Sequence, residues 1–230
     1  AIRYLKETSD YNPVVHVCSS SEVYGRANRQ AHLTENSKFH GASPYSISKI
    51  GTDYLGQFYG EAYQIKTFVT RMGTHSGPRR SDVFFESTLT KQVALIEAGF
   101  QDPIVQLGNL KSVRTFQDVR DAVRAYYLLS IKSAGGDLLP GEAFNIAGNE
   151  VFLLSEIVEM VLDMSTRNDI RVATDESRLR PIDADYQMFD NSKIMNAIDW
   201  KPTISVKEML RDLLNHWRVE INKGNFPLNR

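Results

Sequence analysis

The chain has 230 residues, of which 42% are hydrophobic and 24% charged, and its formal net charge is -1. This composition is typical of a globular protein with a real core, and without a run of about 18 apolar residues it excludes disordered and membrane-spanning classes. The balanced charge gives no electrostatic reason to expect nucleic acid or an anionic membrane as a partner. No charged-then-apolar leader opens the sequence, and the single Cys18 permits no internal disulfide, so we expect a cytoplasmic protein.

The first half of the chain predicts alternating helices and strands. Residues 1–8 are typical of the end of a helix, and a break at Asn12-Pro13 precedes a buried strand over 14–18. Polar residues over 25–42 predict a loop, after which Ser43-Pro44 caps a helix over 45–63. We then expect a strand over 65–70, a loop over 71–80, a helix over 83–98 with Phe84, Leu89, Val93 and Ile96 inward, and extended segments over 104–107 and 113–116.

The second half continues this alternation less regularly. Three helices are predicted to begin at side-chain caps, namely Asp118, Ser155 and Ser205. The inward residues expected on them are Val119, Val123, Tyr126 and Leu129, then Ile157, Val158, Val161 and Leu162, and finally Val206, Met209, Leu210, Leu213, Leu214 and Trp217. Strands are expected over 143–147 and 170–173. The pattern therefore predicts an α/β fold with a mostly parallel sheet and a smaller α+β lobe.

Tyr45 and Lys49 are four residues apart at the start of the predicted helix over 45–63, so they share one face. An ammonium group beside a phenol favours the phenolate, which allows a tyrosine with an ordinary pKa of about 10 to act as a base at neutral pH. The spacing alone fits a solvated helical pair better than it fits a catalytic base. It therefore indicates a general base only together with other motifs.

A second polar group, Ser19 to Glu22, directly follows the predicted strand over 14–18. Open α/β sheets bind their ligands at the carboxyl ends of their strands, so this group is a candidate for a site. Glu22 also fits a structural role as an acceptor for backbone amides at the strand end. Cys18 fits buried packing better than a role as a nucleophile, because it ends an apolar run.

Taken in order, several motifs together resemble the extended short-chain dehydrogenase/reductase family of nucleotide-sugar enzymes. The motifs are Ser-Ser-Ser-Glu-Val-Tyr-Gly over 19–25, Ser-Pro-Tyr-x-x-x-Lys over 43–49, Arg-x-x-x-x-x-Gly-Pro-Arg over 71–79, Gly108-Asn109-Leu110, Arg-Thr-Phe-Gln-Asp-Val-Arg-Asp over 114–121, Phe144-Asn145-Ile146, and Arg-Leu-Arg-Pro over 178–181. The resemblance covers essentially the whole chain. Within the family, the chain is most similar to the GDP-mannose 4,6-dehydratases and the GDP-4-keto-6-deoxymannose reductases.

The resemblance implies a partial Rossmann-like doubly wound sheet. Residues 1–148 would hold the C-terminal portion of the dinucleotide-binding domain with interspersed substrate-lobe segments, and residues 149–230 mainly the substrate lobe. Asp118 and Asp121 are expected to form caps and salt bridges rather than to act in catalysis.

The resemblance also implies a role for each candidate site residue. Tyr45 would accept the proton of the sugar 4-hydroxyl, with Lys49 as its activator and a ribose ligand. Ser20 would hydrogen-bond the same sugar oxygen, and Glu22 would remove the proton at carbon 5. The remaining implied residues are Ser19, Tyr45, Lys49, Thr74 and His75 for the cofactor, and Arg79, Lys91, Arg114 and Arg180 for the substrate, with no metal site.

These roles describe a nucleotide-sugar 4,6-dehydratase of the GDP-mannose type that uses NADP or NAD. The resemblance leaves three related activities open: an NADPH-dependent 4-keto-6-deoxysugar reductase, a UDP-glucuronate decarboxylase and a 4-epimerase. The glutamate at position 22 favours the dehydratase or the decarboxylase, because simple 4-epimerases generally carry a small or neutral residue there. The family also implies a homodimer formed through the helix that bears Tyr45.

Two departures from the family pattern bear on these expectations. Gly73-Thr74 stands where relatives usually carry Phe-Asn, which leaves the identity of the sugar open. The Gly-x-x-Gly-x-x-Gly turn that binds the cofactor pyrophosphate is not among these 230 residues, so we expect roughly 90–100 further residues upstream. On this expectation the 230 residues alone are a catalytically silent fragment that binds at most a sugar nucleotide or a partner.

Overall fold

A three-stranded parallel sheet lies at one end of the molecule in the computed structural model, which describes residues 1–25, 32–179 and 186–225. Its strands are β1 (Val15–Cys18), β2 (Thr67–Met72) and β6 (Glu142–Ile146), in the order β1-β2-β6. Every residue of the central strand β2 is buried, as expected for a parallel strand that is covered on both faces. Within the described residues, β1 pairs with β2 on one side only.

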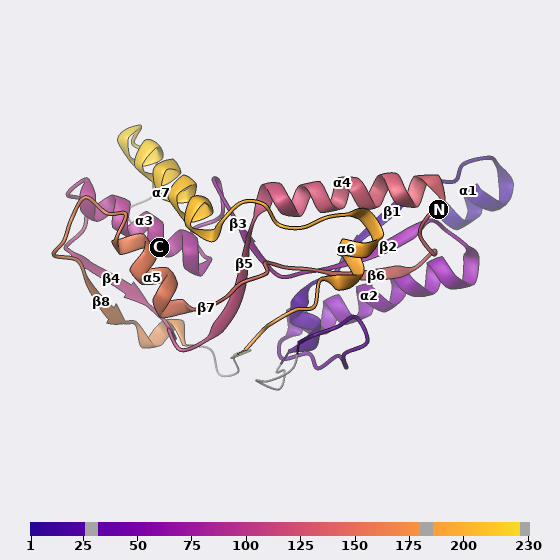
Figure 1. Cartoon of the computed structure of the whole chain (residues 1–230), viewed down its shortest axis with the longest axis horizontal. Coiled ribbons are helices and arrows are strands. Elements are labelled where there is room, and N and C mark those ends of the chain that lie inside the picture. Colours follow the sequence, from indigo (N-terminus) through magenta and orange to yellow (C-terminus); the bar gives the residue numbers. More distant parts are fainter. Residues whose placement is uncertain (26–31, 180–185, 226–230) are drawn as a thin grey trace.

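Helices cover both faces of this sheet. Figure 1 shows α2 (Pro44–Tyr63) along one face and α4 (Val119–Gly135) along the other. Neighbouring residues of β1 point to opposite faces, so Val17 lies under Gly56 of α2 while His16 contacts the ring of Tyr126 in α4. The short helix α6 (Ser192–Ile198) joins α4 in the core on its side, and α1 (Ile2–Thr8) lies at the end of the molecule.

The other end of the molecule is built from shorter strands and three helices (Figure 1). Strands β3 (Thr74–Ser76), β5 (Val113–Asp118) and β7 (Val151–Leu153) form a mixed sheet, and β4 (Ile104–Leu107) pairs in parallel with β8 (Arg171–Thr174). The helices α3 (Phe85–Glu97), α5 (Leu154–Leu162) and α7 (Val206–Asn222) enclose one core cluster. The predicted α/β fold with a parallel sheet is confirmed.

The region around β2 differs from the prediction. The strand begins two residues later than expected and continues to Met72, so Arg71 belongs to a buried strand and not to a loop. A buried arginine is tolerated there because Asp53 pairs with it. The expected loop over 71–80 also contains β3, which pairs in parallel with β5.

Two of the predicted inward residues face solvent. Phe84 is 41% exposed, because it lies before the first turn of α3 in extended backbone and packs under the Arg80 guanidinium, 3.4 Å from its ring centre. Val123 is 56% exposed, because the buried face of α4 is set by smaller residues, Ala122 and Ala125. Two short elements, β7 and α6, were not predicted from the sequence.

Of the three helix caps predicted in the second half of the chain, two are confirmed. Asp118 accepts a hydrogen bond from the Arg120 amide (2.7 Å), and Ser205 accepts one from the Glu208 amide (3.2 Å). Ser155 instead lies inside α5, whose first turn is capped by Glu156 accepting from the amide of Leu153 at 2.7 Å. As expected, Asp121 forms a salt bridge, with Arg124 at 2.7 Å.

Candidate active site

A short 3-10 turn, η1 (Ser21–Tyr24), places Glu22 at the carboxyl end of β1. Ser20 caps the turn, since its hydroxyl accepts a hydrogen bond from the Glu22 amide at 3.2 Å. Gly25 ends it with φ 54°, and a Cβ atom there would lie 1.7 Å from the carbonyl oxygen of His40, so only glycine fits. The His40 amide also donates to the carbonyl of Val23 at 2.8 Å. Local contacts therefore hold the turn at both ends.

The first turn of α2 is equally well defined. Ser43 and Ser46 form a capping box, with amide-to-hydroxyl distances of 3.1 Å and 2.9 Å, and Pro44 occupies the first helical position. The box satisfies amides that would otherwise have no partner at the start of a helix. Tyr45 follows directly and is more than half exposed, so its hydroxyl is accessible to a ligand.

Lys49 connects the start of α2 to the end of β1. Its ammonium donates to the carbonyl oxygen of Cys18 at 2.8 Å and lies 5.7 Å from the centre of the Tyr45 ring. The two residues thus share a helical face, as the spacing predicts. Within the described residues the ammonium has this single acceptor, which leaves two N–H donors for a ligand.

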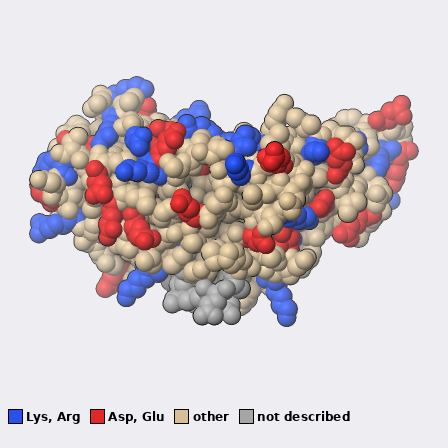
Figure 2. Space-filling view, in the orientation of Figure 1, with Lys and Arg blue, Asp and Glu red and all other residues tan. Residues whose placement is uncertain are grey.

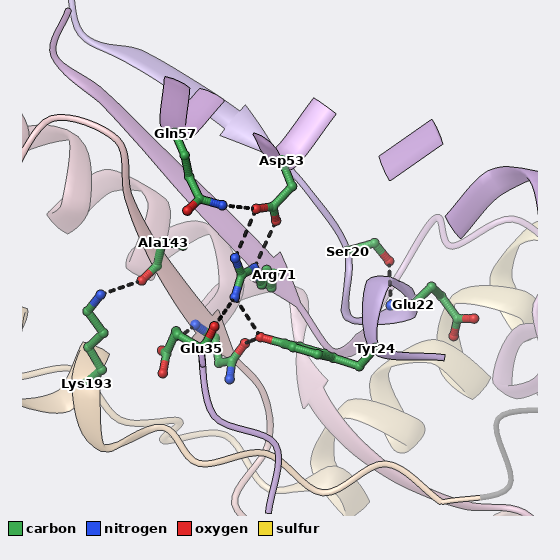
Figure 3. Close-up of polar contacts among 10 residues, drawn as sticks. Ser20, Glu22, Tyr24, Glu35, Asp53, Gln57, Arg71, Ala143 and Lys193 are labelled. Atoms are coloured by element: carbon green, nitrogen blue, oxygen red, sulfur yellow. Dashed lines mark hydrogen bonds and ion pairs between the residues drawn. The ribbon is translucent and has the colours of Figure 1, made fainter. Parts of the chain in front are cut away.

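The turn η1 packs against α2, so Ser20, Glu22, Tyr45 and Lys49 are brought to the same edge of the sheet. Glu22 is half-buried, and its carboxylate points away from Tyr24, as Figure 3 shows. It accepts a long hydrogen bond of 3.4 Å from the side-chain amide of Gln187. The sequence analysis missed Gln187, because 165 residues separate it from Glu22 and no local pattern marks it.

The predicted cofactor residues Ser19, Thr74 and His75 follow the ends of β1 and β2. Ser19 is buried, and its hydroxyl has no hydrogen-bond partner among the described residues. Thr74 and His75 are half-buried in β3, and burial lowers the pKa of His75, so its imidazole stays neutral. A neutral imidazole and a buried unpartnered hydroxyl fit the polar groups of a dinucleotide.

The described substrate residues come from three segments, since Arg79 lies in the loop after β3, Lys91 in α3 and Arg114 in β5. Arg79 is exposed in the left-handed region, with φ 72°. Lys91 forms a salt bridge with Asp82 at 2.8 Å and lies 5.4 Å from the Trp217 ring centre, so its charge is already balanced. Arg114 is half-buried in β5 and donates to the carbonyl of Val113 at 3.0 Å. Arg180 lies outside the described residues.

The surface charge forms no large patch of one sign on the face seen in Figure 2, where basic and acidic side chains alternate. Among the described residues, no group of three or more His, Cys, Asp or Glu side chains is arranged to hold a metal ion. The part of the chain that the structure describes also contains no helix long and apolar enough to cross a membrane.

An apolar cavity of about 700 Å³ lies away from these residues, between α1, β1 and α2. It is lined by side chains such as Tyr4, Val15, Val17, Leu55 and Tyr59, and none of the predicted site residues contributes to it. The cavity and the predicted site residues therefore lie in different parts of the molecule.

Relatives of known sequence agree with the resemblance. The chain is 26% identical over 207 residues to the GDP-6-deoxy-D-mannose reductase of Pseudomonas aeruginosa, covering 89% of this chain and 66% of that protein. It is 27% identical over 225 residues to the human GDP-mannose 4,6 dehydratase, covering 90% of this chain and 58% of that protein. The chain thus spans about 58–66% of the length of these relatives.

Solved structures show the same fold. The P. aeruginosa protein RMD, complexed with NADPH, superposes with a TM-score of 0.84 at 24% identity, covering 93% of this chain and 69% of that one. A dTDP-glucose 4,6-dehydratase from Bacillus anthracis in complex with NAD gives a TM-score of 0.78 at 25% identity, covering 99% and 68%. The sequence model of the family described as GDP-mannose 4,6 dehydratase matches residues 1–213. The chain therefore belongs to the GDP-mannose 4,6 dehydratase family.

Proposed function

We propose that this chain supplies the acid/base groups and the sugar-nucleotide lobe of an NADP- or NAD-dependent 4,6-dehydratase that acts on GDP-mannose. The observation that supports this most directly is that the turn carrying Glu22 packs against the helix carrying Tyr45 and Lys49. Glu22, the proposed base for carbon 5, and Tyr45, the proposed base for the 4-hydroxyl, then lie at the same edge of the sheet. In the proposed enzyme, residues 1–148 belong mainly to the dinucleotide-binding domain and residues 149–230 mainly to the substrate lobe.

The chemistry assigned to these residues is proton transfer at the 4-hydroxyl, at carbon 5 and at the hydroxyl that leaves carbon 6. Tyr45 takes the proton of the sugar 4-hydroxyl while the Lys49 ammonium stabilises the phenolate, and Ser20 hydrogen-bonds the same sugar oxygen. Once carbon 4 is a ketone, the proton at carbon 5 is more acidic, and the Glu22 carboxylate removes it and passes it to the hydroxyl that leaves carbon 6 as water. When carbon 6 is reduced, carbon 5 takes up a proton, and the proton held by Tyr45 balances this uptake. A well-placed general acid or base of this kind contributes about 10²–10⁴-fold in rate.

A bound NADP or NAD supplies the redox step, because its nicotinamide accepts a hydride from carbon 4 and returns one to carbon 6. The residues proposed to hold the nicotinamide and ribose end are Ser19, Tyr45, Lys49, Thr74 and His75. The unpartnered Ser19 hydroxyl and the two remaining donors of Lys49 support this assignment. For the sugar diphosphate we propose Arg79, Arg114 and Arg180, since guanidinium groups bind phosphates in a bidentate manner, together with Lys91.

The test uses the full-length protein with GDP-mannose and NADP, and measures formation of a 4-keto-6-deoxy sugar. Glu22→Gln should lower the rate of product formation by about 10²–10⁴-fold, which leaves a measurable residual rate, while Glu61→Gln, an exposed change on α2, should leave it unchanged. Turnover of the keto sugar with NADPH, with no product from GDP-mannose, would favour the reductase instead. That outcome is the second candidate because a GDP-6-deoxy-D-mannose reductase is among the relatives, and a reductase needs Tyr45 and Lys49 but no base for carbon 5.

The 230 residues alone should behave differently from the full-length protein. Since β1 pairs on one side only within the described residues and the relatives are longer, we propose that this chain by itself neither binds NADP tightly nor turns over. Isothermal titration calorimetry of the 230-residue chain with NADP checks this. Micromolar binding would contradict it.

We also propose that the full-length protein is a cytoplasmic homodimer that associates through α2. The exposed apolar side chains of this helix, among them Tyr54 and Phe58, support an interface there. Sedimentation measurements should show that Phe58→Lys weakens the dimer, while Leu139→Lys, in an exposed loop before β6, leaves it intact. An unchanged dimer in Phe58→Lys would exclude α2 as the interface.

A further inference from the structure

A fully enclosed arginine lies behind the candidate active site. Arg71 of β2 is 3% exposed, and its guanidinium forms a two-pronged salt bridge with Asp53 of α2, with distances of 2.9 Å from Nε to Oδ2 and 3.0 Å from Nη2 to Oδ1. Gln57, one turn further along α2, donates to the same carboxylate at 2.5 Å. Removing two charges from water costs free energy, so a buried ion pair raises the question of which structural role offsets that cost.

The other edge of the guanidinium reaches the turn that carries Glu22. Nη1 of Arg71 donates to the hydroxyl of Tyr24 at 3.0 Å and to the carbonyl of Glu35 at 2.7 Å. The Tyr24 hydroxyl in turn donates to Oδ1 of Asn145 in β6 at 2.7 Å. Burial raises the pKa of Tyr24 to about 12, so the hydroxyl keeps the proton that it donates.

Figure 3 shows how this network relates to the proposed acid/base residues. Tyr24 points from the turn η1 into the network, whereas the carboxylate of Glu22, two residues earlier in the same turn, points away from it. Asp53 follows Lys49 by four residues, one helical turn. A single guanidinium therefore joins the turn bearing Glu22 to the helix bearing Lys49, without itself touching either side chain.

We propose that Arg71 is a positioning residue. It acts through the hydroxyl of Tyr24 to fix the position of the Glu22 carboxylate relative to Tyr45 and Lys49. The proposal rests on the proposed function for its catalytic consequence, while the anchoring of η1 is a property of the fold. Asp53 accepts from Nε and Nη2 of Arg71, so the Nη1 donors remain for the Tyr24 hydroxyl and the Glu35 carbonyl. The bond to Tyr24 is the contact through which the guanidinium positions the turn.

Tyr24→Phe is the variant that tests this bond, because it removes one hydroxyl and keeps the ring. Hydrogen-exchange mass spectrometry should show exchange at residues 20–25 at least about tenfold faster, with α2 unchanged. In the full-length protein, kcat for the sugar nucleotide should fall at least about tenfold while KM stays within about twofold. The matched control is Tyr63→Phe, which removes a hydroxyl that accepts from Arg3 at the far end of α2 and should change neither quantity.

A double-mutant cycle separates positioning from other effects. If Tyr24 acts through Glu22, adding Tyr24→Phe to Glu22→Gln should lower kcat no further. The proposal would be overturned if the two substitutions lowered kcat independently, so that their fold-changes multiplied in the double variant. Unchanged hydrogen exchange at residues 20–25 in Tyr24→Phe would also overturn it. Arg71→Lys keeps the positive charge but loses the planar guanidinium that bonds Asp53 and Tyr24 at once. It should therefore reproduce the faster hydrogen exchange at residues 20–25. If the proposed function is wrong, Glu22→Gln keeps full activity while the exchange measurements still decide whether Arg71 anchors the turn.

Discussion

The two faces of α2 invert the usual arrangement of an amphipathic helix. Its inner face, against the sheet, carries small or polar buried residues, namely Ser46, Asp53, Gly56 and Gly60. Its outer face carries large apolar residues that are more than half exposed, namely Ile47, Tyr54, Leu55 and Phe58. A helix packed on a sheet normally shows the opposite pattern.

The difference shows that the inner face is built for close approach. A Cβ atom on Gly56 would lie 2.9 Å from side-chain atoms of both Val17 and Val69, so the helix backbone already contacts the sheet side chains. This approach allows the short side chain of Asp53 to reach Arg71 in the central strand. The apolar area that α2 gives up on this side is present on the outer side, where we propose a second subunit.

Breaking the buried pair should have the largest effect. Asp53→Ala leaves the Arg71 guanidinium buried without its counter-charge, which should lower the free energy of unfolding by about 3–5 kcal/mol. Urea denaturation of the chain measures this loss. Glu61→Ala, an exposed change on the same helix, is the control and should change little. A loss for Asp53→Ala within about 0.5 kcal/mol would show that the pair is not structural.

Crowding the inner face should have a smaller effect. The Cβ atom of Gly60→Ala would lie 2.1 Å from the backbone nitrogen of Gly141 and 2.4 Å from the hydroxyl of Thr67, so the helix must shift. Overpacking of this kind costs about 1–3 kcal/mol. The change should appear in urea denaturation as a lower midpoint with an unchanged slope. An unaltered midpoint would show that α2 does not pack as closely as the structure indicates.

The opposite face of the same sheet provides a pH-dependent comparison. His16 lies there between Phe68 and Tyr126, and burial lowers its pKa to about 4. Below its ordinary pKa of about 6.5, the unfolded chain binds a proton that the folded chain excludes, so stability falls as the pH drops from about 6.5 to 4. For this partly exposed ring we expect a loss of about 1–2 kcal/mol.

Denaturant midpoints measured across this pH window check the contribution of His16. His16→Gln should flatten the dependence, since the amide keeps a partner for the hydroxyl of Thr70, 2.8 Å from Nε2 of His16, but does not titrate. Equal slopes in the two proteins would assign the pH dependence to other groups.

The exposed side of α2 should give the smallest effect, and one of opposite sign. A Cβ atom on Gly51 meets no atom within 4 Å, so Gly51→Ala adds helix propensity without crowding. It should raise the free energy of unfolding by up to about 1 kcal/mol. Gly60→Ala is the matched change on the inner face. A destabilised Gly51→Ala monomer would show that the outer face is packed against something within the chain.

The sequence predicted the parts of this site that depend on local signals. The helix start at Ser43-Pro44 and the shared face of Tyr45 and Lys49 follow from spacings of three and four residues, and the structure shows both. The pair of Arg71 and Asp53 was not predicted, because 18 residues and a change of element separate them. Arg71 was assigned to the predicted loop over 71–80, which Gly73, Gly77 and Pro78 indicate, whereas it lies in the strand that precedes these residues.

The chain separations within the network also bear on the order of folding. Tyr24 is separated from Arg71 by 47 residues and from Asn145 by 121 residues. Forming these two hydrogen bonds therefore requires two long loops of the chain to close. At about 5–20 residues per second, Asn145 is synthesised roughly 6–24 s after Tyr24. During that interval the turn η1 lacks its final acceptor. The turn that carries Glu22 therefore cannot complete its hydrogen bonds until β6 has been synthesised.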